Sequence, residues 1–233
     1  TARDTTGALS GTVAGISVNA AAFSKFQLSV PNGMDSKGHI LVTAGETISL
    51  TVRATDAYGN TISGYKGKVK FTSTDTLAGL PTDYSYTATD AGTHTFSVSL
   101  KTATPNSVVW SFGVVDGGNA ATLATITNFE VINAAAAKFV LAVPSNIRTG
   151  SPFALRVTVL DAFGNKVKNY FGTVHFSNTA GIAGLPADYT FDGTDAGDHS
   201  FTATLNVAGN QTISVTDTVN SDVKSSVVIA VKI

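Results

Sequence analysis

The sequence predicts an all-β protein built as two tandem β-sandwiches, and three observations lead to that prediction. The composition favours sheet over helix, because the apolar residues are mostly Val, Ala, Phe, Leu and Ile, the polar ones are mostly Thr and Ser, and glycines number 22. Apolar and polar residues alternate with a period of two. A long segment also occurs twice. With 233 residues and 43% hydrophobic residues, the chain has enough material for two domains with buried cores.

The duplication is visible when residues 45–96 are aligned with residues 150–201 without gaps, which leaves roughly half of the positions identical. The shared strings include "DAYGN" with "DAFGN", "AGLPTDY" with "AGLPADY", and "TDAGTHTF" with "TDAGDHSF". A repeat of this length has the size of a domain rather than that of a solenoid turn. We therefore expect residues 22–132 and 133–233 to be two copies of one domain.

Within each copy the apolar pattern predicts short strands separated by turns. In "ISLTVRAT", Ile48, Leu50 and Val52 fall on one face, and "GKVKFTS" and "HTFSVSL" alternate in the same way. Clusters of Gly, Asp, Asn and Pro separate these runs at intervals of about 8–12 residues. About seven strands in ~100 residues match the size of an immunoglobulin-like sandwich.

The first 21 residues belong to neither copy. Residues 1–18 align with the last strand of the first copy, and "TVAGISV" (residues 12–18) has the pattern of that strand. We expect it to be the final strand of a preceding repeat, and the chain to be part of a longer array. A lone strand is not stable without a partner, so it would pair with an exposed sheet edge.

These motifs carry a resemblance to a known group of proteins. The "DAxGN" turn, "YxGxVxF", "LPxDY", "TDAGxHxF" and a closing "VTDT" strand resemble the tandem immunoglobulin-like repeats of bacterial surface and secreted proteins, and broadly the invasin and intimin type modules of bacterial adhesins. The resemblance covers nearly the whole chain. It implies an extracellular or cell-surface location and modules that act mainly as spacers and sometimes as binding tips.

The repeated turn contains a carboxylate, an aromatic ring and an amide, yet its residues favour a structural role. An Asp at the start of a turn accepts hydrogen bonds from N–H groups two residues on, and Gly supplies a positive φ. A general acid at Tyr58 would need its hydroxyl, which the equivalent Phe163 lacks. The residues expected to build the two turns are Asp56, Gly59, Asn60, Asp161, Gly164 and Asn165.

Other reactive side chains recur without completing a site. His94 and His199 each follow an Asp by four residues, but the chain has no Cys and no Ser in a nucleophile motif, so we expect hairpins and no enzyme. No metal or cofactor is expected. Calcium remains an alternative, although it needs six to eight oxygen ligands and the acidic residues are scattered. The calcium candidates are Asp83, Asp90, Asp188 and Asp195, with Asp116 and Asp217 also near strand ends.

Residues that differ between the copies are the candidates for an individual function. The first copy has an insertion of about eight residues, "NGMDSKGHILVTAG", which contains Met34 and His39, and loops of this kind often carry function. It also has the only Trp, Trp110, which either contacts a partner or caps the core beside the junction. The tyrosines shared by both copies, Tyr65 and Tyr84 with their counterparts, are expected to pack with their phenol oxygens on backbone groups.

The sequence thus predicts a structural function: a spacer segment of a bacterial extracellular array, in an adhesin stalk, a surface fibre or a secreted protein. The alternative is a recognition module that binds a glycan or a protein through the insertion and Trp110. Expected partners are neighbouring modules and, through sheet edges, other copies. A net charge of -1 without a basic cluster argues against nucleic acid, and no apolar run is long enough for membrane insertion.

Overall fold

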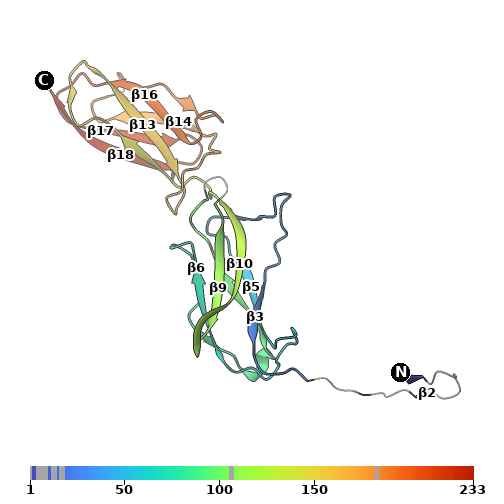
Figure 1. Cartoon of the computed structure of the whole chain (residues 1–233). Coiled ribbons are helices and arrows are strands. Elements are labelled where there is room, and N and C mark those ends of the chain that lie inside the picture. Colours follow the sequence, from blue (N-terminus) through green and yellow to red (C-terminus); the bar gives the residue numbers. More distant parts are fainter. Residues whose placement is uncertain (1, 4–9, 12–14, 16–18, 105–107, 182–183) are drawn as a thin grey trace.

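The protein consists of two β-sandwiches arranged end to end (Figure 1). The computed structural model describes residues 2–3, 10–11, 15, 19–104, 108–181 and 184–233. Strands β1 (Ala2–Arg3) and β2 (Ser10–Gly11) pair antiparallel with each other, outside both sandwiches. The predicted strand at residues 12–18 lies outside the described residues, apart from Gly15. Across the described ranges, the structure has no helix with the length and hydrophobicity of a membrane span.

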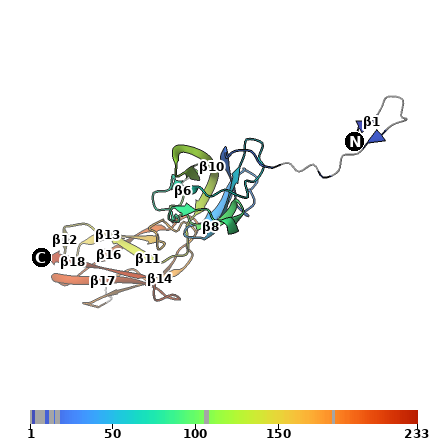
Figure 2. The ribbon, with the colours of Figure 1, turned by 90° about the horizontal axis from the view of Figure 1, so that it is seen from below.

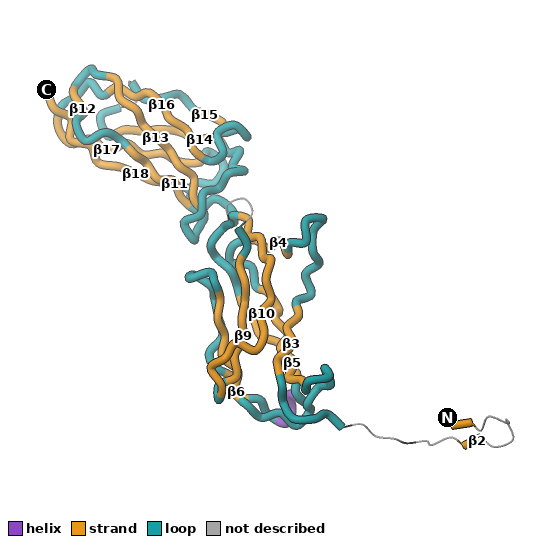
Figure 3. Tube along the Cα trace, viewed as in Figure 1, coloured by secondary structure: helices purple, strands orange, loops and turns teal. Residues whose placement is uncertain are grey.

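The first sandwich has a sheet of three strands, in the order β3-β5-β8, facing a sheet of five, in the order β4-β10-β9-β6-β7 (Figure 3). One turn of 3-10 helix, Ala88–Asp90, precedes β8. The strands are β3 (Lys25–Ser29), β4 (Ile40–Thr43), β5 (Ile48–Thr55), β6 (Lys68–Ser73), β7 (Tyr84–Ser85), β8 (Thr93–Val98), β9 (Trp110–Asp116) and β10 (Asn119–Ile132).

The second sandwich repeats this topology, with sheets in the order β11-β13-β16 and β12-β18-β17-β14-β15. Its strands are β11 (Lys138–Ala142), β12 (Ile147–Arg148), β13 (Pro152–Leu160), β14 (Thr173–Asn178), β15 (Tyr189–Thr190), β16 (Asp198–Thr204), β17 (Gly209–Asp217) and β18 (Lys224–Lys232). The predicted all-β fold of two tandem sandwiches is therefore confirmed.

Each sandwich is held by its own hydrophobic core, and the period-two pattern explains how. In β5, Leu50 and Val52 are fully buried, and Thr51 between them faces outward. Opposite them, Phe112 and Phe129 from the larger sheet are buried and meet edge to face at 5.2 Å between ring centroids. Residues from the two inner faces thus interdigitate as in other aligned sandwiches.

Within residues 19–104, 108–181 and 184–233 each sandwich has eight strands, where the sequence predicts about seven. The additional strands are short: β7 and β15 have two residues each and extend the larger sheet at its edge beside β6 and β14. A strand of two residues leaves no alternation in the sequence, which is why the pattern does not reveal it.

The chain enters each sandwich at one end and leaves it at the other, as the views in Figures 1 and 2 show. Near the exit, an early strand runs parallel to the last strand of the same sandwich. In the first sandwich β4 pairs with β10 over four residue pairs, from Ile40 with Phe129 to Thr43 with Ile132. In the second, β12 pairs with β18 over two.

Candidate functional site

The "DAYGN" turn of the first sandwich is built around a buried carboxylate. Asp56 has no exposed surface. Its Oδ1 accepts hydrogen bonds from the N–H groups of Tyr58 (2.9 Å) and Asn60 (2.8 Å). Its Oδ2 accepts the Asn60 side-chain amide (2.9 Å) and the N–H of Ala21 (3.0 Å). These bonds, that from Ala21 foremost, lower the pKa of Asp56 to about 2. The carboxylate therefore ties the entering chain to the turn.

The second sandwich repeats the arrangement around Asp161, which is also fully buried. Its carboxylate accepts the N–H groups of Phe163 (2.9 Å) and Asn165 (2.8 Å), the Asn165 side-chain amide (2.8 Å) and the N–H of Ala134 (3.0 Å). Gly59 and Gly164 occupy the same left-handed conformation, with φ of 88° and 90°. The shared residues of the motif thus make the same bonds in both copies.

In the second copy this turn also forms the joint between the sandwiches. The ring of Phe163 packs against the core of the first sandwich, above Gly45, where a Cβ atom would clash with the ring. The side chain of Asn165 hydrogen-bonds two backbone groups of the first sandwich. It donates from Nδ2 to the carbonyl of Lys101 (2.7 Å) and accepts on Oδ1 from the N–H of Ala103 (2.9 Å).

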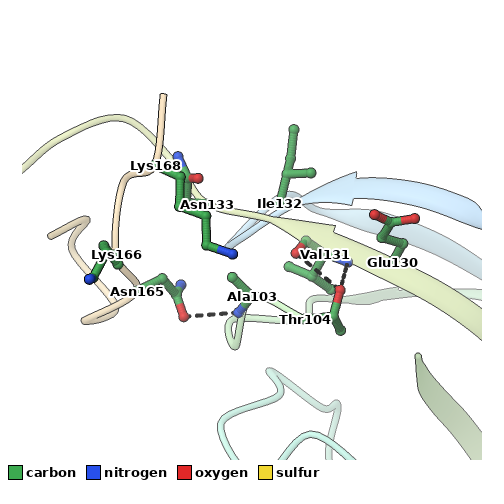
Figure 4. A pocket seen from close by; sticks show the side chains of 9 residues that line it. All are labelled: Ala103, Thr104, Glu130, Val131, Ile132, Asn133, Asn165, Lys166 and Lys168. Atoms are coloured by element: carbon green, nitrogen blue, oxygen red, sulfur yellow. Dashed lines mark hydrogen bonds between the residues drawn. The ribbon is translucent and has the colours of Figure 1, made fainter. Parts of the chain in front are cut away.

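An open cleft of about 340 Å³ lies beside the joint (Figure 4). Ala103, Thr104 and the end of β10 form one wall, and Asn165, Lys166 and Lys168 of the second sandwich form the other. Lys166 is already paired with Asp198, at 2.8 Å. The cleft therefore brings residues of both sandwiches together, but it gathers no acid and base in contact with each other.

The His–Asp pairs belong to clusters with a tyrosine. His94 Nδ1 is 2.6 Å from Asp90 Oδ1, and the His94 ring lies on the Tyr84 ring with centroids 4.3 Å apart. The Tyr84 hydroxyl donates to the same carboxylate at 3.1 Å. The second sandwich contains the same cluster of Tyr189, Asp195 and His199. Each cluster joins the loop before β8 or β16 to the strand itself.

In the first sandwich, the pKa values of Asp90 and Tyr84 are shifted further from neutral pH. Burial works to raise the pKa of Asp90, but hydrogen bonds from the Thr87 N–H and from His94 outweigh it and lower the pKa to about 2. Burial, followed by the Asp90 carboxylate, raises the pKa of Tyr84. A general acid or base works best with a pKa near the working pH. The tuning of Asp90 and Tyr84 thus suits a structural cluster.

The structure does not bring the four calcium candidates together. Asp90 and Asp195 lie in the two clusters just described, one in each sandwich. Asp83 is 3.8 Å from the ammonium group of Lys68, and Asp188 is bonded to a histidine ring at 2.7 Å. Calcium requires several converging oxygens, and no two of these four carboxylates lie together.

Within the described ranges, one group of side chains has the composition of a metal site: Asp35, His39 and Glu130. His39 Nδ1 is 2.9 Å from Glu130 Oε2, and Asp35 Oδ1 accepts the His39 N–H at 2.8 Å. Asp35 and His39 come from the insertion, and Glu130 from β10, so the parallel pairing of β4 with β10 unites them. Three ligands of this kind could hold a zinc ion, yet each already has a hydrogen-bond partner.

The two other candidates from the first copy differ in their surroundings. Met34 is 64% exposed in the insertion. Trp110 is half-buried against the first core, and its indole Nε1 donates to the carbonyl of Thr102 at 2.7 Å. Trp110 therefore caps the core and holds the loop that carries Lys101 and Ala103, the backbone partners of the joint.

Two features escape the sequence analysis. The expectation that the shared phenols reach backbone groups is wrong for all four tyrosines. The hydroxyls of Tyr65 and Tyr170 bond the carboxylates of Asp116 and Asp217 at 2.5 Å, and those of Tyr84 and Tyr189 bond the carboxylates of the His–Asp pairs. The second feature is Asp75, which is buried and accepts the N–H groups of residues 77, 101 and 102. The second copy has Ala at the equivalent position, so the repeat gives no sign of it.

No protein-family model matches the chain, and no curated protein matches it. Solved structures do. The chain is similar to bacterial adhesins. With the Escherichia coli adhesin FdeC the identity is 23% and the TM-score 0.44, over 92% of this chain and 67% of that one. With the Yersinia pseudotuberculosis adhesin InvE the identity is 17% and the TM-score 0.40, over 91% of this chain and 60% of that one. With domains 5–6 of the S-layer protein SbsC the identity is 17% and the TM-score 0.30, over 91% of this chain and 98% of that one.

The chain spans about two thirds or less of the length of the two adhesin structures. In all, 655 chains of solved structures match, so a sandwich of this kind is common and its function must be argued from its own residues.

Proposed function

We propose that the chain is a spacer segment of a bacterial extracellular array of immunoglobulin-like modules. In this proposal residues 22–132 and 133–233 are two modules, and residues 1–21 close a preceding one. The residues that both copies share support it, because they serve the fold: the Asp56 and Asp161 turns fix the entering chain, and the His–Asp–Tyr clusters fix a loop. The residues that the copies share therefore define the fold, and we assign no catalytic activity to them.

The observation that carries the proposal is the path of the chain through each sandwich. Tension applied at both ends acts first on β3, which pairs with β5, and on β10. Once β3 is detached, it would pull β4 and β10 in opposite directions along their length, because these two strands are parallel and neighbours. The hydrogen bonds between them are then loaded together in shear rather than one after another. The same holds for β12 and β18. Such a module resists stretching, as a spacer in an extracellular array must.

Single-molecule stretching of the full chain between handles at its two ends tests the proposal. We expect two separate unfolding events, each releasing about 100 residues, or roughly 35 nm of chain at ~3.5 Å per residue. The second sandwich should unfold at the lower force, because β12 and β18 share two residue pairs where β4 and β10 share four. Extension at low force without discrete events would contradict a spacer that carries tension.

The alternative, a recognition module, is favoured by one observation. Met34 (64% exposed) and Leu41 (48% exposed) present apolar surface on and beside the insertion, next to the group of Asp35, His39 and Glu130. Exposed apolar residues near polar ones are typical of binding surfaces. A glycan array probed with the full chain and with Met34→Ser tests it. Saturable binding that the substitution abolishes would support recognition, and its absence would support the spacer.

A further inference from the structure

The joint between the two sandwiches consists of a plug and a socket. The plug is the turn at residues 161–165, which presents the Phe163 ring and the Asn165 amide. The socket is the end of the first sandwich, where Gly45, the Lys101 carbonyl and the Ala103 N–H meet these two side chains. Gly45 has a φ of 80°, and its N–H donates to the Leu100 carbonyl at 2.7 Å, which places it beside the loop that carries Lys101.

The first sandwich carries a second plug, at its end away from the joint. Within residues 56–60, Asp56 accepts the same three hydrogen bonds as Asp161 does within residues 161–165, and the N–H of Ala21 supplies the fourth, as that of Ala134 does for Asp161. The ring of Tyr58 is 86% exposed, and Asn60 is exposed as well. Within the described part of the chain, Asn60 Oδ1 accepts no hydrogen bond, whereas the equivalent atom of Asn165 accepts one from Ala103. An aromatic ring and an oriented amide are thus presented to solvent.

The second sandwich carries a second socket, near Ile233. Gly150 has a φ of 73° and donates its N–H to the Leu205 carbonyl at 2.9 Å, as Gly45 does to Leu100. A Cβ atom on Gly150 would meet nothing within 4 Å, so the place that Phe163 fills above Gly45 is open here. The backbone that follows, Asn206–Ala208, is exposed and stands where Lys101–Ala103 stand in the first sandwich.

The loop of this second socket is held in the same manner as that of the first. Trp110 donates to the carbonyl of Thr102, and Gln211 donates to the carbonyl of Val207, its equivalent. The Gln211 side chain is itself fixed, because its Oε1 accepts the side-chain amide of Asn178 at 2.7 Å. Trp110 and Gln211 therefore hold equivalent carbonyl groups, those of Thr102 and Val207. The neighbouring backbone groups that would bond an Asn side chain are thus held in position in both sandwiches.

We propose that the two ends of this chain are complementary halves of one joint, so that a second copy, joined after Ile233, docks its Tyr58 ring over Gly150. Its Asn60 amide then bonds the Asn206 carbonyl and the Ala208 N–H. Asn206 takes the place of Lys101, whose ammonium group lies over the Phe163 ring at 6.0 Å from its centroid. This inference rests on the proposed function and specifies the residues that connect one pair of modules to the next. Repeated head to tail along one chain, such a contact joins each pair of modules to the next.

A tandem fusion tests the proposal. Joining Ile233 of one full chain directly to Ala21 of a second reproduces the spacing of the present joint, in which Asn133 precedes Ala134. With only the first copy isotope-labelled, hydrogen exchange reports on its Ala208 amide. We expect exchange at least tenfold slower in the fusion than in the single chain, because Asn60 of the second copy accepts this N–H. The Ala103 amide, already bonded to Asn165, serves as the internal standard.

Matched substitutions locate the effect. Asn60→Ala in the second copy should return Ala208 to the exchange rate of the single chain. Asn60→Ala in the first copy is the matched control: it removes the same bond to Asp56 but should leave the exchange of Ala208 slow, because this Asn60 lies at the far end of the first sandwich from the joint. An Ala208 amide that exchanges at the same rate in the fusion and in the single chain would overturn the proposal. The spacer function would survive that result if stretching of the single chain still showed two unfolding events, so the two ideas fail separately.

Discussion

Replacing Phe163 with alanine should weaken the first sandwich, although Phe163 belongs to the second. Its ring packs on the core of the first sandwich above Gly45. A buried Phe removes roughly 200 Å² from water, and Phe163 is half-buried, so about 100 Å² at about 25 cal/mol per Å² gives about 2.5 kcal/mol. Tyr58→Ala is the matched control, because Tyr58 has the same place in the motif but is 86% exposed.

Urea unfolding followed by two signals measures the effect. The fluorescence of Trp110, the only tryptophan, reports on the first sandwich, and circular dichroism reports on both. Phe163→Ala should lower the free energy of unfolding of the first sandwich, as reported by the Trp110 fluorescence, by about 2.5 kcal/mol. Tyr58→Ala should stay within about 0.5 kcal/mol of the parent protein. Equal effects of the two substitutions would refute the reasoning, because the joint would then contribute nothing.

Three further predictions concern single sites. Asp75→Ala should destabilise the first sandwich by about 3 kcal/mol in urea unfolding, because three N–H groups lose a charged acceptor; a change below about 1 kcal/mol would contradict this role. Trp110→Phe should lower the free energy of unfolding by about 1 kcal/mol in thermal unfolding, because the hydrogen bond to the Thr102 carbonyl is lost. No change would show that this bond does not contribute to stability. Asp90 and Asp198 have pKa values of about 2, below their ordinary 3.8. Their contribution to the free energy of unfolding is therefore complete above about pH 4 and should be lost as the pH falls toward 2, as measured by urea unfolding at each pH. A free energy of unfolding that stays constant over that range would contradict the bonding described.

Much of the fold could be predicted because its determinants are local or repeated. Alternation sets which face of β5 is buried, and Asp56 and Gly59 fix a turn within five residues of sequence. The equivalence of Tyr58 and Phe163 indicated a packing surface rather than an acid. What that surface packs on could not be predicted, because Phe163 and Gly45 are brought together only by the way two folded sandwiches meet.

The features that the sequence missed are contacts between distant residues, and some of these contacts occur in one copy alone. Asp75 reaches the N–H groups of Lys101 and Thr102, and nothing in its local sequence distinguishes it from an exposed loop residue. His39 and Glu130 meet because β4 runs parallel to β10, a pairing that leaves no local pattern. Predicting such sites requires the sheet order, which alternation does not supply.

The central claim is that the two sandwiches form one stiff spacer because the 161–165 turn is docked on the first sandwich. Residual dipolar couplings of the full chain in a weakly aligning medium test it most directly, since two rigidly joined bodies share one alignment tensor. The structure predicts a single tensor for both sandwiches, which Asn165→Ala combined with Phe163→Ala splits into two of different magnitude. Two different tensors in the unsubstituted protein would show that the sandwiches move independently and would contradict the claim.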